Sequence, residues 1–485
     1  MKQAQNLKNK AIVLTSAKLF ESLVQIATPM VLVRYIDADI FGVYRHLWLV
    51  INMIMSIVPL GVPQALQYFL PKSDFEEKNI YVAQTILFLL LASIISAILL
   101  TKNGIFTPHG LDSVFDKSVF LIPLFVFFWI FTCLLDFLPN AIEKNYQQAF
   151  FIITVTVVRS VLIIGAAVFF GDLYYIILAF ACSTLIKLLF LFYFTVRNFD
   201  LKFGTIRPLL LKTHLRYAIP FGLTSAVYGL RKQGEQFIVS YLFTPALFGS
   251  FSLATMATLP FEIIRTSISN VLLPKMVIAH YNNDVLSTVN YSKCANILLT
   301  STIYPVLVYV IFFSVDIVQT LFGINYLDAA PVLRIYMLQL FVTLELGTII
   351  KVYALGRFDL KNNIFVLIFT LIASLFLSNL TGLIGAAIAS ALAGLLRTTF
   401  ILIKISRKLN IPILALQNWK RLLAVFIISW LSIVPVYFIT EYFNSYHLLI
   451  RLLIFFILQA IFYIAILSSF GEFKRIKLLL NTHLK

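Results

Sequence analysis

Long apolar stretches separated by short polar segments dominate this chain of 485 residues. It is 60% hydrophobic and only 12% charged, whereas roughly a quarter of an ordinary globular chain is charged. Because a helix of about 20 apolar residues crosses the hydrocarbon core of a bilayer, we predict an all-α polytopic membrane protein with about fourteen transmembrane helices. The expected spans are 12–35, 42–66, 80–101, 118–138, 147–170, 174–195, 215–243, 247–272, 295–315, 331–351, 363–380, 383–403, 422–440 and 448–470.

The distribution of Lys and Arg predicts the orientation. With both ends on one side of the membrane, 25 Lys and Arg fall in or beside the segments on that side and five fall on the other. Since cytoplasmic loops carry an excess of Lys and Arg, we expect both termini to be cytoplasmic. The net charge of +17 is then a result of topology and does not indicate nucleic-acid binding. We interpret the first apolar segment as a retained span, because it lacks a small-residue cleavage site.

A motif near the start recurs near the middle. Phe41-Gly42 precedes an apolar span that ends Leu70-Pro71-Lys72, and Phe248-Gly249 precedes one that ends Leu273-Pro274-Lys275. The two glycines are 207 residues apart (249 − 42). In a membrane protein such a repeat indicates two halves of similar fold with a substrate path between them.

The longest expected cytoplasmic connections divide the chain. We predict two six-helix repeats that form a V-shaped pair of lobes, followed by two extra C-terminal helices. The boundaries are 1–196 for the N-terminal lobe, 197–214 for a cytoplasmic linker, 215–404 for the C-terminal lobe, 405–421 for a second linker, 422–470 for helices 13 and 14, and 471–485 for a basic cytoplasmic tail.

Eleven ionisable residues fall well within the expected spans. Each costs about 2.5–3.5 kcal/mol at the centre of a bilayer, so they must face water or one another. Seven cations against four carboxylates leave an excess of three positive charges, and a shared cavity would attract an anion. They are Lys18, Glu21, Arg159, Lys187, Arg231, Lys232, Glu235, Glu262, Arg265, Glu345 and Arg397.

Two expected helices carry a polar stripe, and each opens one half of the repeat. At 100° per residue the first stripe spans about 80° and the second about 60°. The stripes consist of Lys18, Glu21, Gln25 and Thr28 in the first half, and of Thr224, Tyr228, Arg231 and Glu235 in the second. A lumen between two lobes requires such faces.

Two interpretations of these charges are open. Lys18 with Glu21, Arg231 with Glu235, and Glu262 with Arg265 have helical spacing and either neutralise each other or contact substrate. Arg159, Lys187 and Arg397 have no such local partner, which favours a place in the lumen; the alternative is pairing across helices, for instance with Glu345. Lys232 either snorkels or points between helices.

We expect substrate contacts in the lumen from Arg159, Lys187, Arg231, Arg397, Lys18, Arg265, Gln25 and Tyr228. Glu21, Glu235 and Glu345 are candidates for coupling to a proton or sodium gradient, since a buried carboxylate can change protonation. We expect no metal site and no other cofactor. The six histidines are scattered and show no HExxH spacing, and no GxSxG, Walker or Rossmann signature occurs, so we expect no enzyme.

The repeated motifs resemble those of a known family. Residues 34–44 (RYIDADIFGVY), 61–65 (GVPQA) and 70–72 (LPK) are similar to the first-half signature of the Wzx-type polysaccharide and oligosaccharide lipid flippases. These belong to the multidrug/oligosaccharidyl-lipid/polysaccharide exporter superfamily. Residues 218–223, 245–249 and 267–274 fit its second half, and the resemblance covers nearly the whole chain.

The resemblance implies alternating access by two six-helix lobes. It implies translocation of an undecaprenyl-diphosphate-linked oligosaccharide from the inner to the outer leaflet of the bacterial cytoplasmic membrane, with a cationic lumen that receives the diphosphate. It further implies a glycan polymerase and glycosyltransferases as partners. We expect a monomer. Two alternatives stay open: a multidrug cation antiporter of the same superfamily, which would use the lumen carboxylates, and a non-transporting scaffold of a glycan-assembly complex.

Overall fold

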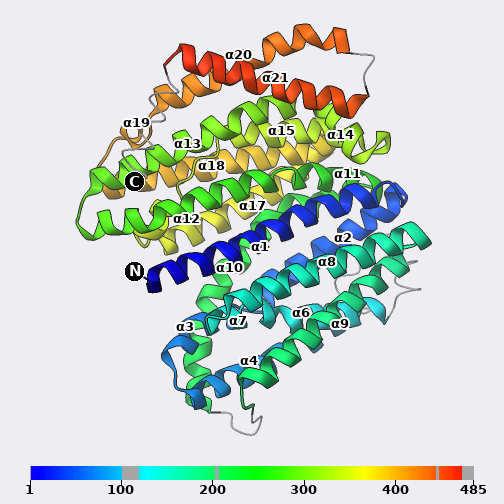
Figure 1. The fold of residues 1–485 in the computed structure, drawn as a ribbon, viewed down its shortest axis with the longest axis vertical. Helices are drawn as coiled ribbons and strands as arrows, with labels where there is room; N and C mark the ends of the chain where they lie inside the picture. Colours follow the sequence, from blue (N-terminus) through cyan, green and yellow to red (C-terminus); the bar gives the residue numbers. More distant parts are fainter. Residues whose placement is uncertain (1, 101–119, 202–206, 444–446, 472–485) are drawn as a thin grey trace. The chain divides into compact units, whose positions relative to one another are not determined.

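The computed structural model describes residues 2–100, 120–201, 207–443 and 447–471, and all regular structure within them is helical (Figure 1). By length and composition, eleven helices in these ranges could cross a membrane. The class of the fold, an all-α polytopic membrane protein, is confirmed. The remaining expected spans fall on α1, on α10 and on α15 with α16, which are more polar or shorter. A total of fourteen stays a prediction.

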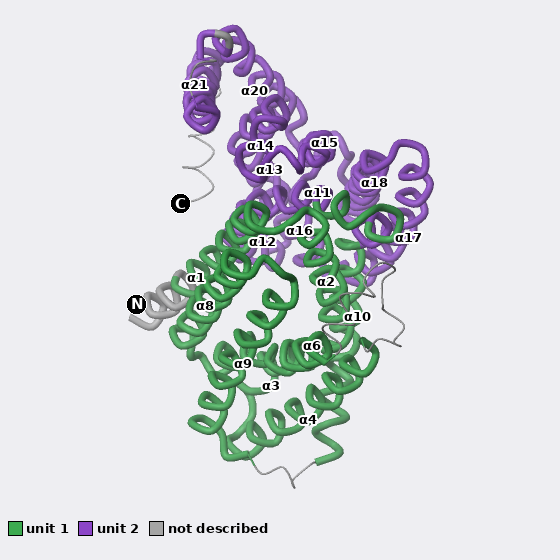
Figure 2. Tube along the Cα trace, turned by 90° about the vertical axis from the view of Figure 1, so that its right-hand side faces the viewer, with its two compact units in different colours: residues 1–233, 240–249 green, residues 234–239, 250–485 purple. Residues whose placement is uncertain are grey.

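The chain divides into two compact units (Figure 2). Unit 1 comprises residues 1–233 and 240–249, and unit 2 comprises residues 234–239 and 250–485. Two helices, α10 (Pro208–Leu242) and α11 (Pro245–Met256), therefore contribute to both. The expected lobe boundaries and the V-shaped pairing stay predictions, and the expected basic tail lies outside the described residues except for Gly471.

Unit 1 has long helices joined through short ones. Helix α1 packs on α8, α8 packs on α9, and α6 packs on both α4 and α9. The elements before α10 are α1 (Lys2–Leu32), α2 (Ala38–Ile57), α3 (Val62–Phe69), η1 (Leu70–Lys72), α4 (Phe75–Leu99), α6 (Leu121–Phe131), η2 (Thr132–Asp136), α7 (Leu138–Ala141), α8 (Asn145–Phe170) and α9 (Leu173–Asn198).

Unit 2 repeats this packing. Three packed helix pairs of unit 1 have counterparts in unit 2. The pair α4–α6 corresponds to α13–α15, α6–α9 to α15–α18, and α8–α9 to α17–α18. Its elements after α11 are α12 (Leu259–Tyr281), α13 (Val285–Phe312), α14 (Ser314–Phe322), η3 (Ile324–Tyr326), α15 (Ala329–Phe341), α16 (Gly347–Val352), α17 (Gly356–Thr381), α18 (Leu383–Leu409), α19 (Ile413–Leu416), α20 (Trp419–Ile439), η4 (Thr440–Phe443) and α21 (Leu448–Ser469). The last long pair, α20 and α21, packs together and against α13.

Corresponding helices of the two units begin in the same way. Asp74 caps α4, with its Oδ1 accepting from the Glu77 amide at 2.8 Å. Asp284 caps α13, with its Oδ1 accepting from the Ser287 amide at 2.9 Å. A carboxylate at this position satisfies an amide that has no partner inside the helix.

The two Phe-Gly motifs pack against each other within unit 1. A Cβ on Gly42 would lie 1.8 Å from the carbonyl oxygen of Pro245, and one on Gly249 would lie 3.2 Å from the Phe41 ring. The Ala246 amide donates to Asp39 Oδ1 at 3.2 Å. Gly42 is therefore explained by a close approach of two backbones that leaves no room for a Cβ, and Gly249 lies on the other side of the same tight contact.

Candidate functional site

Two largely buried cations of unit 1 are held in ion pairs. Glu21 of α1 faces Arg159 of α8, with Oε1 4.0 Å from Nη2. Asp136, the last residue of η2, binds Lys187 of α9, with Oδ2 2.9 Å from Nζ. The cationic side chains are only 12% and 11% exposed, whereas those of Glu21 and Asp136 are 32% and 46% exposed. We call these four residues the unit 1 charge cluster; its cations are largely buried and its carboxylates are more exposed.

An aromatic side chain joins the two pairs. The ring centroid of Trp129 in α6 lies 5.6 Å from the Arg159 guanidinium carbon and 5.6 Å from Lys187 Nζ. Trp48 of α2 packs edge-on against Trp129, with centroids 5.1 Å apart. Cations over an aromatic face are stabilised most when they are desolvated. Each buried cation of the cluster therefore has both a carboxylate and an aromatic partner.

The stripe expected on α1 has an exposed and a buried part. Gln25 Nε2 donates to Glu21 Oε1 at 3.4 Å, and Lys18 is close enough to act electrostatically on Glu21. The side chains of Lys18 and Gln25 are exposed. Thr28 is buried, and its hydroxyl contacts the Ser160 hydroxyl at 3.1 Å. Lys18 and Gln25 are thus accessible, whereas Thr28 packs against α8.

The stripe expected on α10 is centred on an aromatic residue. The Arg231 guanidinium carbon lies 5.2 Å, and Lys232 Nζ 5.8 Å, from the ring centroid of Tyr228. Glu235 lies in the segment that belongs to unit 2, where the Tyr336 hydroxyl donates to its Oε1 at 3.4 Å. Tyr228 remains exposed and Glu235 is buried.

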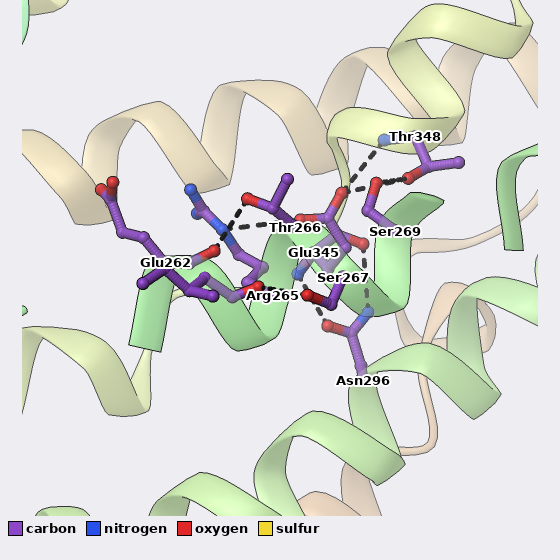
Figure 3. Close-up of polar contacts among 9 residues, drawn as sticks. Glu262, Arg265, Thr266, Ser267, Ser269, Asn296, Glu345 and Thr348 are labelled. Carbon is purple, nitrogen blue, oxygen red and sulfur yellow. Dashed lines mark hydrogen bonds and ion pairs between the residues drawn. The ribbon is translucent and has the colours of Figure 1, made fainter. Parts of the chain in front are cut away.

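Glu345 is the centre of a buried polar network in unit 2 (Figure 3). Its Oε2 lies 3.7 Å from Arg265 Nε. Its Oε1 accepts from the Thr348 amide at 3.1 Å and from the Thr348 hydroxyl at 3.2 Å. Its own amide donates to Asn296 Oδ1 at 2.7 Å. We call Arg265, Asn296, Glu345 and Thr348 the unit 2 charge cluster.

A break between helices explains why a carboxylate is held there. Helix α15 ends at Phe341 and α16 begins at Gly347, so the first-turn amide of Thr348 has no helical partner and is available to Glu345. Asn296 Nδ2 also donates to Gln417 Oε1 at 3.1 Å. The cluster therefore links α12, α13 and α16 to the connection between α19 and α20.

Arg397 has a partner that the sequence analysis did not name. Its Nη2 lies 3.5 Å from Asp359 Oδ1, in the first turn of α17. The suggested pairing of Arg397 with Glu345 is wrong, because the Glu345 carboxylate faces Arg265 and the start of α16. For Arg159, Lys187 and Arg397 alike, the structure shows pairing across helices.

Two of the partner carboxylates escaped prediction because of where they lie in the sequence. Asp136 lies near the end of the stretch 118–138, and Asp359 lies in the connection before 363–380. An unpaired cation in a span, next to a carboxylate at the edge of a neighbouring span, is the signal that would have found them. With both included, seven cations meet six carboxylates (4 + 2), and the excess positive charge falls from three to one.

The described residues hold no group of three or more His, Cys, Asp or Glu side chains that could ligate a metal ion. Their cysteines are free thiols, with Cys133 and Cys294 buried.

Several solved structures share this fold. The lipid II flippase MurJ in an inward closed conformation aligns with a TM-score of 0.71 at 16% identity, covering 95% of this chain and 99% of that chain. An inward-facing multidrug resistance MATE family transporter of the MOP superfamily aligns at 0.58 and 15%, covering 82% and 98%. A MOP superfamily transporter from Pyrococcus furiosus aligns at 0.56 and 12%, covering 82% and 94%. By their titles these proteins are one flippase and two transporters.

The sequence itself matches a family of known proteins. No curated protein sequence is detectably similar to it. Residues 7–280, more than half of the chain, match the family described as polysaccharide biosynthesis protein. With its membrane-spanning helices and a fold shared with MurJ and the MATE transporters, the chain belongs to the polysaccharide biosynthesis protein family.

Proposed function

We propose that this protein is a flippase for an undecaprenyl-diphosphate-linked oligosaccharide. The cargo would be an O-antigen, capsule or exopolysaccharide repeat unit, carried from the inner to the outer leaflet of the bacterial cytoplasmic membrane by alternating access. The observation that carries the proposal is the family match over residues 7–280. The multi-pass helical fold and the excess of Lys and Arg on one side support it.

The extent of the structural matches favours a lipid flippase over a drug transporter. The MurJ match leaves out about 5% of this chain, roughly 24 residues, whereas α20 and α21 with their connection occupy residues 419–469. That match must therefore include much of the last helix pair. The MATE match covers 82% of the chain. Because this chain has the additional helix pair α20 and α21, its match to MurJ covers more of its length than its match to the MATE transporter does.

The largely buried cations of unit 1 are suited to binding the diphosphate of the proposed substrate. A diphosphate accepts charge-assisted hydrogen bonds from guanidinium and ammonium groups. Arg159 and Lys187 are held by carboxylates that are more exposed than the cations themselves, so those pairs could exchange a carboxylate for a phosphate. Lys18, Gln25 and Tyr228 are exposed and would contact the sugars. Arg231, Arg265 and Arg397 complete the set of expected substrate contacts.

Ion coupling is part of the proposal. Glu21, Glu235 and Glu345 are the candidates to exchange a proton or sodium ion as the cavity alternates. Of these, Glu21 is half-buried and forms a loose ion pair with Arg159, at 4.0 Å, whereas Glu235 and Glu345 are buried. We therefore rank Glu21 first.

A multidrug antiporter is the second candidate, since several structures with this fold are multidrug MATE transporters. It would use Glu21, Glu235, Glu262 and Glu345 to bind organic cations. A scaffold of a glycan-assembly complex, which would not depend on the charged residues for transport, is the third. One experiment separates the three.

The protein is depleted in a bacterial strain whose surface glycan depends on it, and the lipid-linked oligosaccharide is assayed on each leaflet. Plasmid-borne wild type is compared with Arg159→Ala, Arg231→Ala and Arg397→Ala. Arg451→Ala is the matched control, because Arg451 is also paired, with Asp316 at 3.2 Å, but lies at the start of α21. Intact glycan-lipid on the cytoplasmic face, reproduced by the first three variants and not by the control, supports flipping through a charged path.

Two outcomes contradict the proposal. Normal surface glycan together with new sensitivity to cationic drugs would assign the protein to drug export. Loss of surface glycan on depletion, with full rescue by all the arginine variants, would instead support the scaffold.

A further inference from the structure

An aromatic and cationic patch lies at the surface of unit 1, where α3 meets α10. The rings of Tyr68 in α3 and Tyr217 in α10 are stacked, with centroids 4.6 Å apart and planes 13° apart. Lys72 Nζ lies 3.7 Å from the Tyr68 centroid. The two tyrosines are nevertheless 44% and 43% exposed. We call Tyr68, Lys72 and Tyr217 the tyrosine patch.

The patch rests on a rigid contact between backbones. Gly61 has φ +73°, and a Cβ on Gly222 would lie 2.1 Å from the carbonyl carbon of Leu60. The buried His214 of α10 donates from Nε2 to the carbonyl oxygen of Val62 at 3.1 Å. These contacts hold the start of α3 against α10, and they fix Tyr68 beside Tyr217 without closing the pair off from solvent.

Tyr217 continues the polar stripe of α10. It precedes Tyr228 by 11 residues, which at 100° per residue is three full turns plus about 20°. Arg231 lies about 60° from Tyr228 in the same direction, so Tyr217 falls within the arc that they define. The patch therefore extends the proposed substrate path towards the end of α10 that the Lys and Arg distribution predicts to be cytoplasmic.

The other half of the repeat lacks this arrangement. When the two Leu-Pro-Lys motifs are aligned, Tyr68 corresponds to Val271 (71 − 3 and 274 − 3), although both halves keep the lysine. The motif thus does not need an aromatic residue at this position to fold. A role that only the first half of the protein has therefore explains Tyr68 better than a requirement of helix packing does, because packing would apply to both halves.

We propose that Tyr68, Lys72 and Tyr217 form a subsite that binds the sugar and phosphate groups of the lipid-linked glycan on the cytoplasmic side, before translocation. This inference rests on the proposed function. Tyrosine combines a rigid apolar face, on which the C–H face of a sugar ring can lie, with a hydroxyl for hydrogen bonding. The Lys72 ammonium supplies the charge for a phosphate. The competing explanation is an interfacial aromatic residue facing phospholipid head groups.

The test uses the full-length protein in lipid nanodiscs and two probes, undecaprenyl diphosphate and undecaprenyl diphosphate bearing one N-acetylglucosamine. We expect wild type to bind the sugar-bearing probe more tightly. Tyr217→Ala should weaken binding of that probe about five- to tenfold and leave the sugar-free probe unchanged, as expected for one lost aromatic contact. Lys72→Gln should weaken both.

Tyr241→Ala is the matched control. Tyr241 is 68% exposed on the same helix but lies 13 residues from Tyr228, about 220° around α10. Equal weakening of both probes by Tyr217→Ala and Tyr241→Ala would identify the tyrosines as membrane anchors and overturn the subsite. Unchanged binding in Tyr217→Ala would also overturn it, while the proposed function would stand. If wild type bound neither probe, the proposed function and the subsite would fail together.

Discussion

The same two repeat positions carry charge in both units, yet they are paired differently. Lys187 is the fifteenth residue of α9 and Arg397 the fifteenth of α18 (187 − 173 + 1 and 397 − 383 + 1). Asp136 and Glu345 each lie two residues before a short helix, α7 or α16. In unit 1, Asp136 and Lys187 bind each other. In unit 2 the two corresponding residues bind elsewhere: Glu345 binds Arg265, and Arg397 binds Asp359.

One further position explains the difference. Asp359 is the fourth residue of α17, and the fourth residue of α8 is Gln148. In unit 2, Asp359 forms an ion pair with Arg397. In unit 1 the corresponding residue is the buried, neutral Gln148, which donates to the carbonyl oxygen of Asp136. Because Gln148 offers no negative charge, Lys187 binds the carboxylate of Asp136 instead. A repeated backbone therefore does not dictate repeated ion pairs, and a single acid can redirect two of them.

We expect the largest effect from breaking the unit 2 charge cluster. Glu345→Ala leaves Arg265 without its partner and the Thr348 amide without its acceptor, and should lower the free energy of unfolding by about 3 kcal/mol. Glu345→Gln keeps an acceptor for Thr348 and should lose less. Denaturant titration of the purified protein measures both, and equal stability of Glu345→Ala and wild type would contradict the assignment.

The next largest loss of stability should follow when Asp359 of unit 2 is replaced by glutamine, the residue at the corresponding position 148 of unit 1. Asp359→Gln removes the partner of Arg397, whose side chain is largely buried, and should cost about 2 kcal/mol. The double variant Asp359→Gln with Arg397→Leu should be more stable than the single variant, because it leaves no buried charge. A double variant less stable than Asp359→Gln alone would show that the Arg397 charge has another strong partner.

A smaller effect tests the reverse exchange in unit 1. Asp136→Asn should destabilise by only about 1 kcal/mol, because the Asp136 carboxylate is nearly half exposed, its attraction to Lys187 is screened, and Lys187 keeps the ring of Trp129 as a second partner. Adding Gln148→Asp supplies the acid at the position that Asp359 occupies in unit 2, and should recover part of the loss. Gln148→Asp alone is the control. If the double variant were no more stable than Asp136→Asn, the repeat positions would not be interchangeable.

The smallest expected effect concerns a feature that the units share, the aspartate caps of α4 and α13. Hydrogen bonds from Ser287 lower the pKa of Asp284 below its ordinary value of 3.8. A carboxyl whose pKa is lowered by folding stabilises the protein above the unfolded-state pKa and loses this contribution as the pH falls through the folded-state value. The difference in Tm between wild type and Asp284→Ala should therefore be present at pH 7 and shrink below about pH 4.

Asp74→Ala is the matched change in unit 1 and should give a loss of similar size at pH 7, since the two caps have the same geometry. A Tm difference for Asp284→Ala that grew on acidification would contradict the role of the ionised carboxylate.

Sequence reasoning found the buried bases more readily than their partners. Lys187 and Arg397 stand out because a cation in an apolar stretch is costly wherever the helix lies. Asp136 and Asp359 lie at or beyond the edges of apolar stretches, where a charge is unremarkable, and only the breaks before α7 and the start of α17 bring them to the cations. Trp129 is one of many aromatic residues, so its position beside both cations had no signal in the sequence.

The sequence by itself determined that the protein is a helical membrane protein with an internal repeat and with charges inside its spans. These properties depend on composition, on the length of apolar runs and on helical period, all of which are local. The tertiary structure decided which charges meet, why a glycine is needed at position 42, and where Tyr68 stacks on Tyr217. An ion pair or a close backbone contact joins residues far apart in the chain, so it exists only once particular helices have become neighbours.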